Sequence, residues 1–224
     1  MGADAGARSA PQSGAPVGGT ARPADAGAEP VAGRPLGSDV SASHYTRTAV
    51  ALHWAIAGLI FTALFMGWTM TDMAISPQRL RVYNYHKWVG ITVLWLAVLR
   101  VIWKLTHRSP PLLPMPRWQQ IAAHAGHGLL YLLMLVMPVT GWIYSNAAGY
   151  PVVYLGRLPL PTLVGRNHAL AAGWVRVHGA LGITLAVVVG GHVLAALYHH
   201  FVSRDGTVQR MLTWRHARTG AGEQ

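Results

Sequence analysis

Histidine is the side chain in this sequence whose number and spacing best suit it to chemistry. The chain has 12 histidines and no cysteine. Within its long apolar stretches lie His53, His86, His124, His127, His178 and His192, and at the end of the last stretch lie His199 and His200. His178 and His192 are 14 residues apart, which on an α-helix is close to four turns and about 21 Å of rise. Both imidazoles therefore point to nearly the same face of one helix, at two different depths.

His53 and His86 supply a partner for each of these two histidines. In a bundle of antiparallel helices, His53 lies at the depth of His192, and His86 lies at the depth of His178. Two cross-bundle histidine pairs are the arrangement that clamps a flat macrocycle between axial imidazoles, and helical bundles commonly hold cofactors in this way. Glycines near the histidines, in the stretches WAIAG, HKWVG, HGALG and GGH, would let a porphyrin approach the backbone. The four histidines thus predict two haem sites.

Two other interpretations of the same histidines stay open. A single histidine within a membrane helix is often a hydrogen-bonded packing residue. Imidazole is also a ligand for zinc, copper and nickel, so a histidine-based metal transporter is an alternative. Transport sites of that kind usually add carboxylates, and no Asp or Glu lies between Asp72 and Asp205. The set of available ligands therefore favours haem.

Four apolar segments must position these histidines. They cover residues 48–70, 85–103, 121–144 and 175–201, and each is close to the roughly 20 residues that cross a bilayer as a helix. Pro138 lies inside the third segment, where neighbouring helices can accommodate a kink. We expect an all-α membrane protein, built as a bundle of four transmembrane helices that holds two haem b groups.

The composition excludes several other classes of protein. The 224 residues include 18 Lys and Arg against 7 Asp and Glu, a formal charge of +11, and only 11% of all residues are charged. The long stretch between Asp72 and Asp205 without an acid argues against paired-carboxylate catalysis, carboxylate-rich Mg²⁺ or Ca²⁺ sites and Ser-His-Asp triads. The lack of cysteine excludes disulfides, thiolate zinc sites and iron–sulfur clusters. The basic residues interrupt apolar segments rather than cluster on a polar scaffold, so no nucleic-acid partner is expected.

The sequence also predicts three regions and an orientation. Residues 1–43 are rich in Ala, Gly, Pro and Ser and predict a disordered tail, because they offer almost no large apolar side chain to bury. Residues 44–204 make up the transmembrane domain, and residues 205–224 a cytoplasmic C-terminal tail. Lysines and arginines near the membrane number eight on the side of the termini and six on the other side. The positive-inside rule therefore places both termini in the cytoplasm.

A second group of polar residues collects at the predicted cytoplasmic ends of the third and fourth segments. His124 and His127 share a helix face at i and i+3, and His199 and His200 close the fourth segment. They are either interfacial polar anchors or a quinone-headgroup or proton-exchange site beside the inner haem. Three arginines are either partners of haem propionates or residues that reach the membrane surface and set topology: Arg47, Arg100 and Arg176.

Taken in order, the motifs around these residues resemble those of the prokaryotic cytochrome b561 family, over about residues 44–216. The similar stretches are Y-x-R-x-x-x-x-L-H-W from Tyr45 to Trp54, NYHKWVG around His86, R-x-x-W-K-x-x-x-x-S-P-P ending at Pro111, H-x-x-H-x-x-L-Y-x-L-x-x-x-M-P-x-x-G in the third segment, the two histidines of the fourth, and A-A-L-Y-H-H.

The resemblance implies a bacterial inner-membrane protein with four helices and two haem b groups. By position, its axial ligands are His53 with His192 on the cytoplasmic side and His86 with His178 on the periplasmic side. One member of the family resembles a superoxide:ubiquinone oxidoreductase, in which positions matching His127 and His199 are associated with the quinone site. The lysine expected after the Pro-Pro motif is replaced by Met115, and Arg117 is the nearest basic residue.

Three functions follow as hypotheses. The first is an oxidoreductase that oxidises periplasmic superoxide and reduces ubiquinone in the lipid bilayer. The second is an electron carrier between quinol and a periplasmic redox protein. The third is the histidine-based metal transporter. A haem iron with two axial imidazoles has no open position for oxygen activation, so the first two hypotheses predict outer-sphere electron transfer, one electron at a time.

Overall fold

The computed structural model describes residues 45–107 and 115–212. Four long helices dominate it: α1 (Arg47–Asp72), α2 (Pro77–Thr106), α3 (Arg117–Ala147) and α4 (His168–Tyr198). The short elements are β1 (Val153–Tyr154), β2 (Leu158–Pro159), the π-helix η2 (His199–Ser203) and α5 (Gln209–Leu212). The predicted tail 1–43 and the last residues of the predicted C-terminal tail, 213–224, lie outside the described residues.

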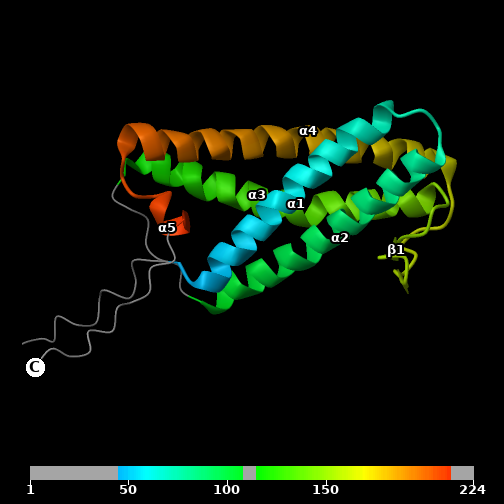
Figure 1. Ribbon diagram of the computed structural model, residues 1–224, viewed down its shortest axis with the longest axis horizontal. Helices are drawn as coiled ribbons and strands as arrows, with labels where there is room; N and C mark the ends of the chain where they lie inside the picture. The colour runs from blue at the N-terminus through cyan, green and yellow to red at the C-terminus, as the bar shows by residue number, and fades with distance from the viewer. Residues whose placement is uncertain (1–44, 108–114, 213–224) are drawn as a thin grey trace, which may run out of the picture. The chain divides into compact units, whose positions relative to one another are not determined.

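The long helices run alternately in opposite directions, as Figure 1 shows. Helix α1 packs on α2, α2 on α3, and α3 on α4. The strands β1 and β2 form an antiparallel hairpin beyond the end of α3. We call this the hairpin end, and the opposite end, where α1 and α3 begin and α5 lies, the α5 end. Each of the four helices is long and apolar enough to cross a membrane, so the predicted all-α membrane fold is confirmed.

Local start signals make the helices longer than the apolar segments that predict them. Helix α2 begins at Pro77, well before residue 85, because the Ser76 hydroxyl accepts a hydrogen bond from the Arg79 N–H and proline suits the first helical turn. The Asn167 side chain likewise caps α4 by accepting from the Leu170 N–H. Helix α3 continues through Pro138. The added turns are more polar and extend the helices beyond the apolar spans.

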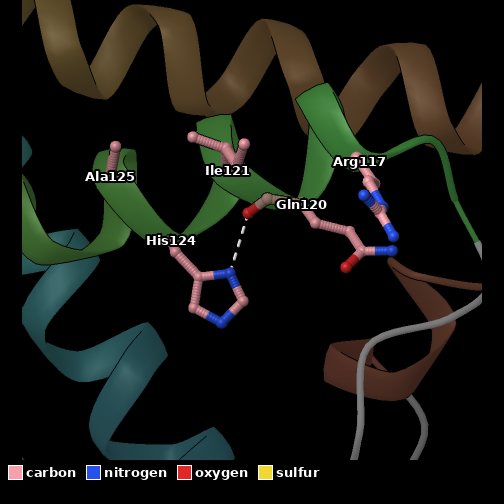
Figure 2. A pocket seen from close by; sticks show the side chains of 5 residues that line it. All are labelled: Arg117, Gln120, Ile121, His124 and Ala125. Atoms are coloured by element: carbon pink, nitrogen blue, oxygen red, sulfur yellow. Dashed lines mark hydrogen bonds between the residues drawn. The ribbon is translucent and has the colours of Figure 1, made fainter.

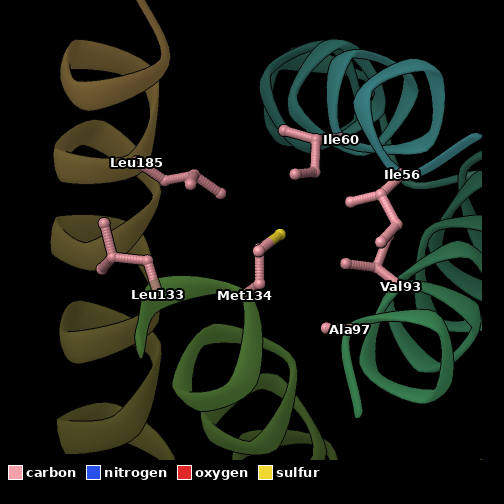
Figure 3. Close-up of a cluster of buried hydrophobic side chains, with 7 residues drawn as sticks. All are labelled: Ile56, Ile60, Val93, Ala97, Leu133, Met134 and Leu185. Carbon is pink, nitrogen blue, oxygen red and sulfur yellow. The ribbon is translucent and has the colours of Figure 1, made fainter. Parts of the chain in front are cut away.

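A compact apolar layer lies at the middle of the bundle and draws on all four helices, as Figure 3 shows. Its buried members are Ile56, Ile60, Val93, Ala97, Leu133, Met134 and Leu185. Large apolar side chains elsewhere remain exposed on the helices, such as Phe65, Ile183 and Leu194, each more than 60% exposed. An apolar exterior around a packed centre is what lipid-facing helices require.

Candidate functional site: two histidine pairs across the bundle

His86 on α2 and His178 on α4 face each other toward the hairpin end. Their ring centroids are 6.1 Å apart and the rings are nearly perpendicular, at 85°. The His178 Nδ1–H donates to the Met137 carbonyl (3.2 Å) and lies 3.1 Å from the Thr140 hydroxyl oxygen. A carbonyl oxygen carries no proton, so Nδ1 must be the protonated nitrogen in the neutral ring. The Nε2 lone pair of His178 is therefore free to bind a metal.

His86 is half-buried beside a backbone carbonyl of a neighbouring helix. Its Nδ1 is buried and forms no hydrogen bond of ordinary geometry, and the carbonyl of Ala63 on α1 is the polar group beside the ring. The His86 ring thus resembles that of His178, which also lies against a backbone carbonyl.

Two glycines let the helix backbones approach this pair. A Cβ built on Gly141 of α3 would lie 2.8 Å from the His178 Cε1, which is closer than real Cβ contacts allow. A Cβ on Gly67 of α1 would lie 3.4 Å from the His86 Cε1. The rings of His86 and His178 thus rest against the glycine positions of α1 and α3.

His53 on α1 and His192 on α4 form the second pair, toward the α5 end. Their ring centroids are 6.2 Å apart, with 66° between the ring planes. The ring of His127 on α3 lies 5.4 Å from that of His192. The Arg100 guanidinium of α2 reaches the same region and places Nη2 3.4 Å from the His53 Nδ1. This end therefore combines three imidazoles with a fixed cation.

Both pairs fit axial ligation of one metal ion each. Two imidazoles on opposite sides of a metal, each with a bond of roughly 2 Å, have ring centroids about 6 Å apart. The measured spacings of 6.1 and 6.2 Å match that value. Within 45–107 and 115–212, no group of three or more His, Asp or Glu side chains could hold a metal ion. The donor set suits a planar ligand that takes two protein ligands and supplies the others itself.

The apolar layer separates the two pairs. Leu185 lies seven residues from each of His178 and His192 along α4, at the midpoint of their roughly 21 Å separation. Leu133 and Met134 of α3 and Val93 of α2 complete the layer at this level. The bundle therefore holds two distinct sites at two depths.

A surface pocket of about 550 Å³ opens on α3 at the α5 end, as Figure 2 shows. It is lined by Arg117, Gln120, Ile121, His124 and Ala125. The His124 Nδ1–H donates to the Gln120 carbonyl at 2.7 Å, which holds the ring at the pocket and leaves Nε2 as an acceptor. The pocket offers one cation, one amide and one imidazole beside apolar surface.

The five residues predicted for a quinone or proton site do not form one cluster. Arg117 and His124 line the pocket, whereas His127 lies beside His192. His199 in η2 contacts the Asp205 carboxylate through Nδ1 at 2.5 Å, and the ring of His200 packs against Phe201. The structure thus places Arg117 and His124 at the pocket, His127 beside His192, and His199 against a carboxylate.

The three predicted propionate partners also differ in placement. Arg100 is half-buried, whereas Arg47 at the start of α1 and Arg176 on α4 are exposed. Nη1 of Arg100 donates to the Ala49 carbonyl (2.8 Å) and Nε to the Tyr131 hydroxyl (3.2 Å). Their role toward propionates stays a prediction.

Sequence reasoning missed the partners of the histidines. The sequence analysis places Asp205 in the C-terminal tail, but its carboxylate binds His199. The short separation of six residues between the two was the one sequence signal for this contact. The sequence patterns name Gly141 as a candidate kink position and as the end of the third-segment motif but leave Thr140 unnamed, and they mark neither residue as a neighbour of His178. Contacts between helices depend on rotation and depth, which one sequence specifies only coarsely.

Histidine pairs across a bundle of four membrane-capable helices are the arrangement typical of membrane cytochromes of the b type. The model of the prokaryotic cytochrome b561 family matches residues 44–214. This chain therefore belongs to the prokaryotic cytochrome b561 family. It is a membrane electron-transfer protein, and membership implies haem b binding.

Three curated proteins are similar to this chain over most of its length. The chain is 31% identical over 172 residues to cytochrome b561 homolog 2 of Escherichia coli, covering 75% of this chain and 90% of the relative. It is 29% identical over 176 residues to the probable superoxide oxidase CybB of Yersinia pestis, covering 75% and 95%. It is 32% identical over 174 residues to cytochrome b562 of Cereibacter sphaeroides, covering 75% and 94%.

Proposed function

We propose that this protein is a superoxide:ubiquinone oxidoreductase that holds two haem b groups, one between His53 and His192 and one between His86 and His178. The two haem sites of the proposal are supported by the ring spacings, 6.2 and 6.1 Å, at two depths of one bundle, and the superoxide chemistry by the similarity to a probable superoxide oxidase. Haem with two axial histidines supplies one-electron transfer without an open coordination position. The protein's own residues must then admit an electron donor at one end and an acceptor at the other.

The hairpin end suits a small anionic donor. Six basic residues lie toward this end, in the first three turns of α2 and α4 and in the connection between α3 and α4: Arg79, Arg81, Lys87, Arg157, Arg166 and Arg176. Among the described residues of this end, Asp72 is the acid that opposes them. A positive surface raises the local concentration of an anion and its rate of association. Superoxide gives up one electron and leaves as O₂.

The pocket at the α5 end suits a quinone headgroup. Arg117 and the Gln120 amide can donate to a quinone carbonyl, and Ile121 and Ala125 offer apolar contact to the ring. His124 and the His199–Asp205 pair lie at the same end and can pass protons to it. The balance is two superoxide anions, one ubiquinone and two protons converted into two O₂ and one ubiquinol.

The direction of this reaction fixes the proposed placement in the cell. We place the protein in the bacterial inner membrane with the hairpin end at the periplasm and both termini in the cytoplasm. Residues 1–43 are then a cytoplasmic tail, 44–204 the transmembrane domain and 205–224 a cytoplasmic segment. The lysine and arginine distribution supports this orientation by eight residues to six.

The first experiment measures reduced-minus-oxidised spectra of the purified protein and of two variants. Wild type should show two low-spin b-type haems, both reduced by superoxide alone and reoxidised by a ubiquinone analogue. His178→Ala should lose about half of the haem, because one ligand pair is broken. His168→Ala is the matched control, since His168 begins the same helix and is exposed; it should keep both haems.

Three results would overturn the proposal. Full haem occupancy in His178→Ala would refute the ligand assignment. Haems reduced by quinol but inert to superoxide would favour the electron carrier. A protein without a Soret band would contain no haem, and the histidine-based metal transporter would then be the remaining hypothesis.

A second experiment tests the quinone pocket separately. Arg117→Gln and His124→Ala should raise the KM for the quinone analogue several-fold while leaving haem content and superoxide-driven reduction intact. Gln119→Ala is the control, because Gln119 lies in the same turn of α3 and does not line the pocket. If Arg117→Gln and His124→Ala had the same KM for the quinone analogue as the Gln119→Ala control, the quinone would not bind in this pocket.

A further inference from the structure

The two histidine pairs have opposite electrostatic surroundings. The His178 Nδ1–H donates to the Met137 carbonyl, an acceptor with partial negative charge. The His53 ring instead lies beside the Arg100 guanidinium, with Nη2 3.4 Å from Nδ1, and a guanidinium is a permanent cation. The bundle is therefore asymmetric along its axis in the charge that surrounds its imidazoles.

Arg100 is held in this position by contacts on two other helices. Nη1 donates to the Ala49 carbonyl of α1, and Nε donates to the Tyr131 hydroxyl of α3. Among the described residues, no Asp or Glu side chain forms an ion pair with Arg100, so no described carboxylate neutralises its charge. The His192 ring lies 6.2 Å from the His53 ring, so the same fixed charge lies near both imidazoles of this pair.

Fixed charges and hydrogen bonds near axial ligands tune the potential of a bound iron. The oxidised iron carries one more positive charge than the reduced iron, so a nearby cation favours the reduced form. A carbonyl that accepts from the imidazole N–H makes the ligand more basic and favours the oxidised form. Both effects are strong where water is excluded, because the effective dielectric constant is low.

We infer that Arg100 raises the reduction potential of the haem held by His53 and His192 above that of the haem held by His86 and His178. This inference rests on the two haem sites of the proposed function. A haem held by each pair would supply one-electron transfer with no bond made or broken, and this difference in potential would favour transfer from the hairpin end to the α5 end. Arg100 is a positioning residue that sets this direction.

The test is a redox titration of single-haem proteins, without superoxide or quinone. His178→Ala should keep the haem between His53 and His192, and His192→Ala should keep the haem between His86 and His178. The inference predicts a higher midpoint potential in His178→Ala than in His192→Ala. The reverse order, or equal midpoints, would overturn it.

Arg100 variants then identify the cause. In the His178→Ala background, Arg100→Gln should shift the midpoint potential downward, because the amide keeps donors but loses the charge. Arg100→Lys should retain most of the wild-type value. In the His192→Ala background, Arg100→Gln should leave the midpoint unchanged. An unchanged midpoint in the first background, or an equal shift in both, would overturn the role of Arg100.

The experiment stays decisive if a single-haem protein is unstable. Arg100→Gln in the two-haem protein should then shift one of two components downward and leave the other in place, and any other pattern contradicts the inference. Failure of the proposed superoxide chemistry would not affect these titrations. Failure of the haem sites would appear separately, as missing haem in the spectra.

Discussion

Gly141 sets how closely α3 approaches the ring of His178. A methyl group there would lie 2.8 Å from Cε1 and 3.1 Å from Nδ1 of that ring. The Nδ1 atom is already fixed by the Met137 carbonyl on the same helix. The ring cannot yield without losing this hydrogen bond, so the position tolerates only glycine.

Three alanine substitutions should therefore rank in a fixed order. Gly141→Ala should displace His178 and remove most of the haem of its pair. Gly67→Ala should have a smaller effect, because its methyl would meet His86 at an ordinary 3.4 Å. Gly126→Ala, also on α3, has no atom within 4 Å of the added methyl and should be neutral. Haem content per protein by pyridine haemochrome assay checks the order, and equal losses at Gly141 and Gly126 would contradict it.

At the scale of elements, the four spans and the matched depths of their histidines could be predicted from the sequence. Apolar length sets the helices, and the 14-residue spacing sets the two levels. The partners of the rings could not be predicted in this way. Arg100 could be seen as a basic residue inside a span, but its contact with His53 depends on how α1 and α2 rotate against each other.

The position of the segment from η2 to α5, residues 199–212, also could not be predicted from the sequence. Its fold depends on contacts between atoms that lie far apart in the sequence, such as the Trp54 Nε1–H that donates to the Met211 carbonyl at 2.9 Å. Asp205 also accepts from the Thr207 N–H at 2.9 Å and binds His199. The segment therefore folds back onto α1 and η2 through a few polar contacts.

Attachment of this segment should depend on the charge of Asp205. Burial raises the pKa of Asp205, but hydrogen bonds from Thr207 and His199 outweigh it and hold the pKa below its usual value. Because the pKa of Asp205 is lower in the folded state, its carboxylate stabilises the attached segment fully at pH values above the ordinary aspartate pKa of about 3.9. This stabilisation is lost as pH falls below that value. The contact should hold at pH 7 and loosen in acid.

A spin label measures this loosening directly. The chain has no cysteine, so Leu212→Cys, at an exposed position of α5, gives a single attachment point. The mobility of the label should rise as pH falls from 5 toward 3. In Asp205→Asn the label should already be mobile at neutral pH, so its mobility should not change with pH. Mobility that is low and constant in both proteins would show that other contacts hold the segment.

At the scale of the whole molecule, the excess positive charge should control the encounter with superoxide. The rate of superoxide-driven haem reduction should fall as salt rises from about 10 to 150 mM, because the Debye length shortens from roughly 30 to 8 Å. Arg81→Gln with Arg157→Gln, both exposed at the hairpin end, should lower the rate at low salt and flatten the salt dependence. Arg204→Gln, at the other end, should do neither. A rate independent of salt would rule out electrostatic guidance.

The apolar layer around Leu185 offers no group that could carry a proton, but it does not block electron tunnelling. Its seven buried residues carry no ionisable group, and a proton needs polar groups or water to move, whereas an electron can tunnel through packed side chains. An electron that crosses this layer in the proposed direction therefore moves negative charge inward with no accompanying ion. The proposed reaction is therefore electrogenic: a membrane potential that is negative inside opposes it by up to about 2.3 kcal/mol per 100 mV, and each proposed turnover adds to that potential.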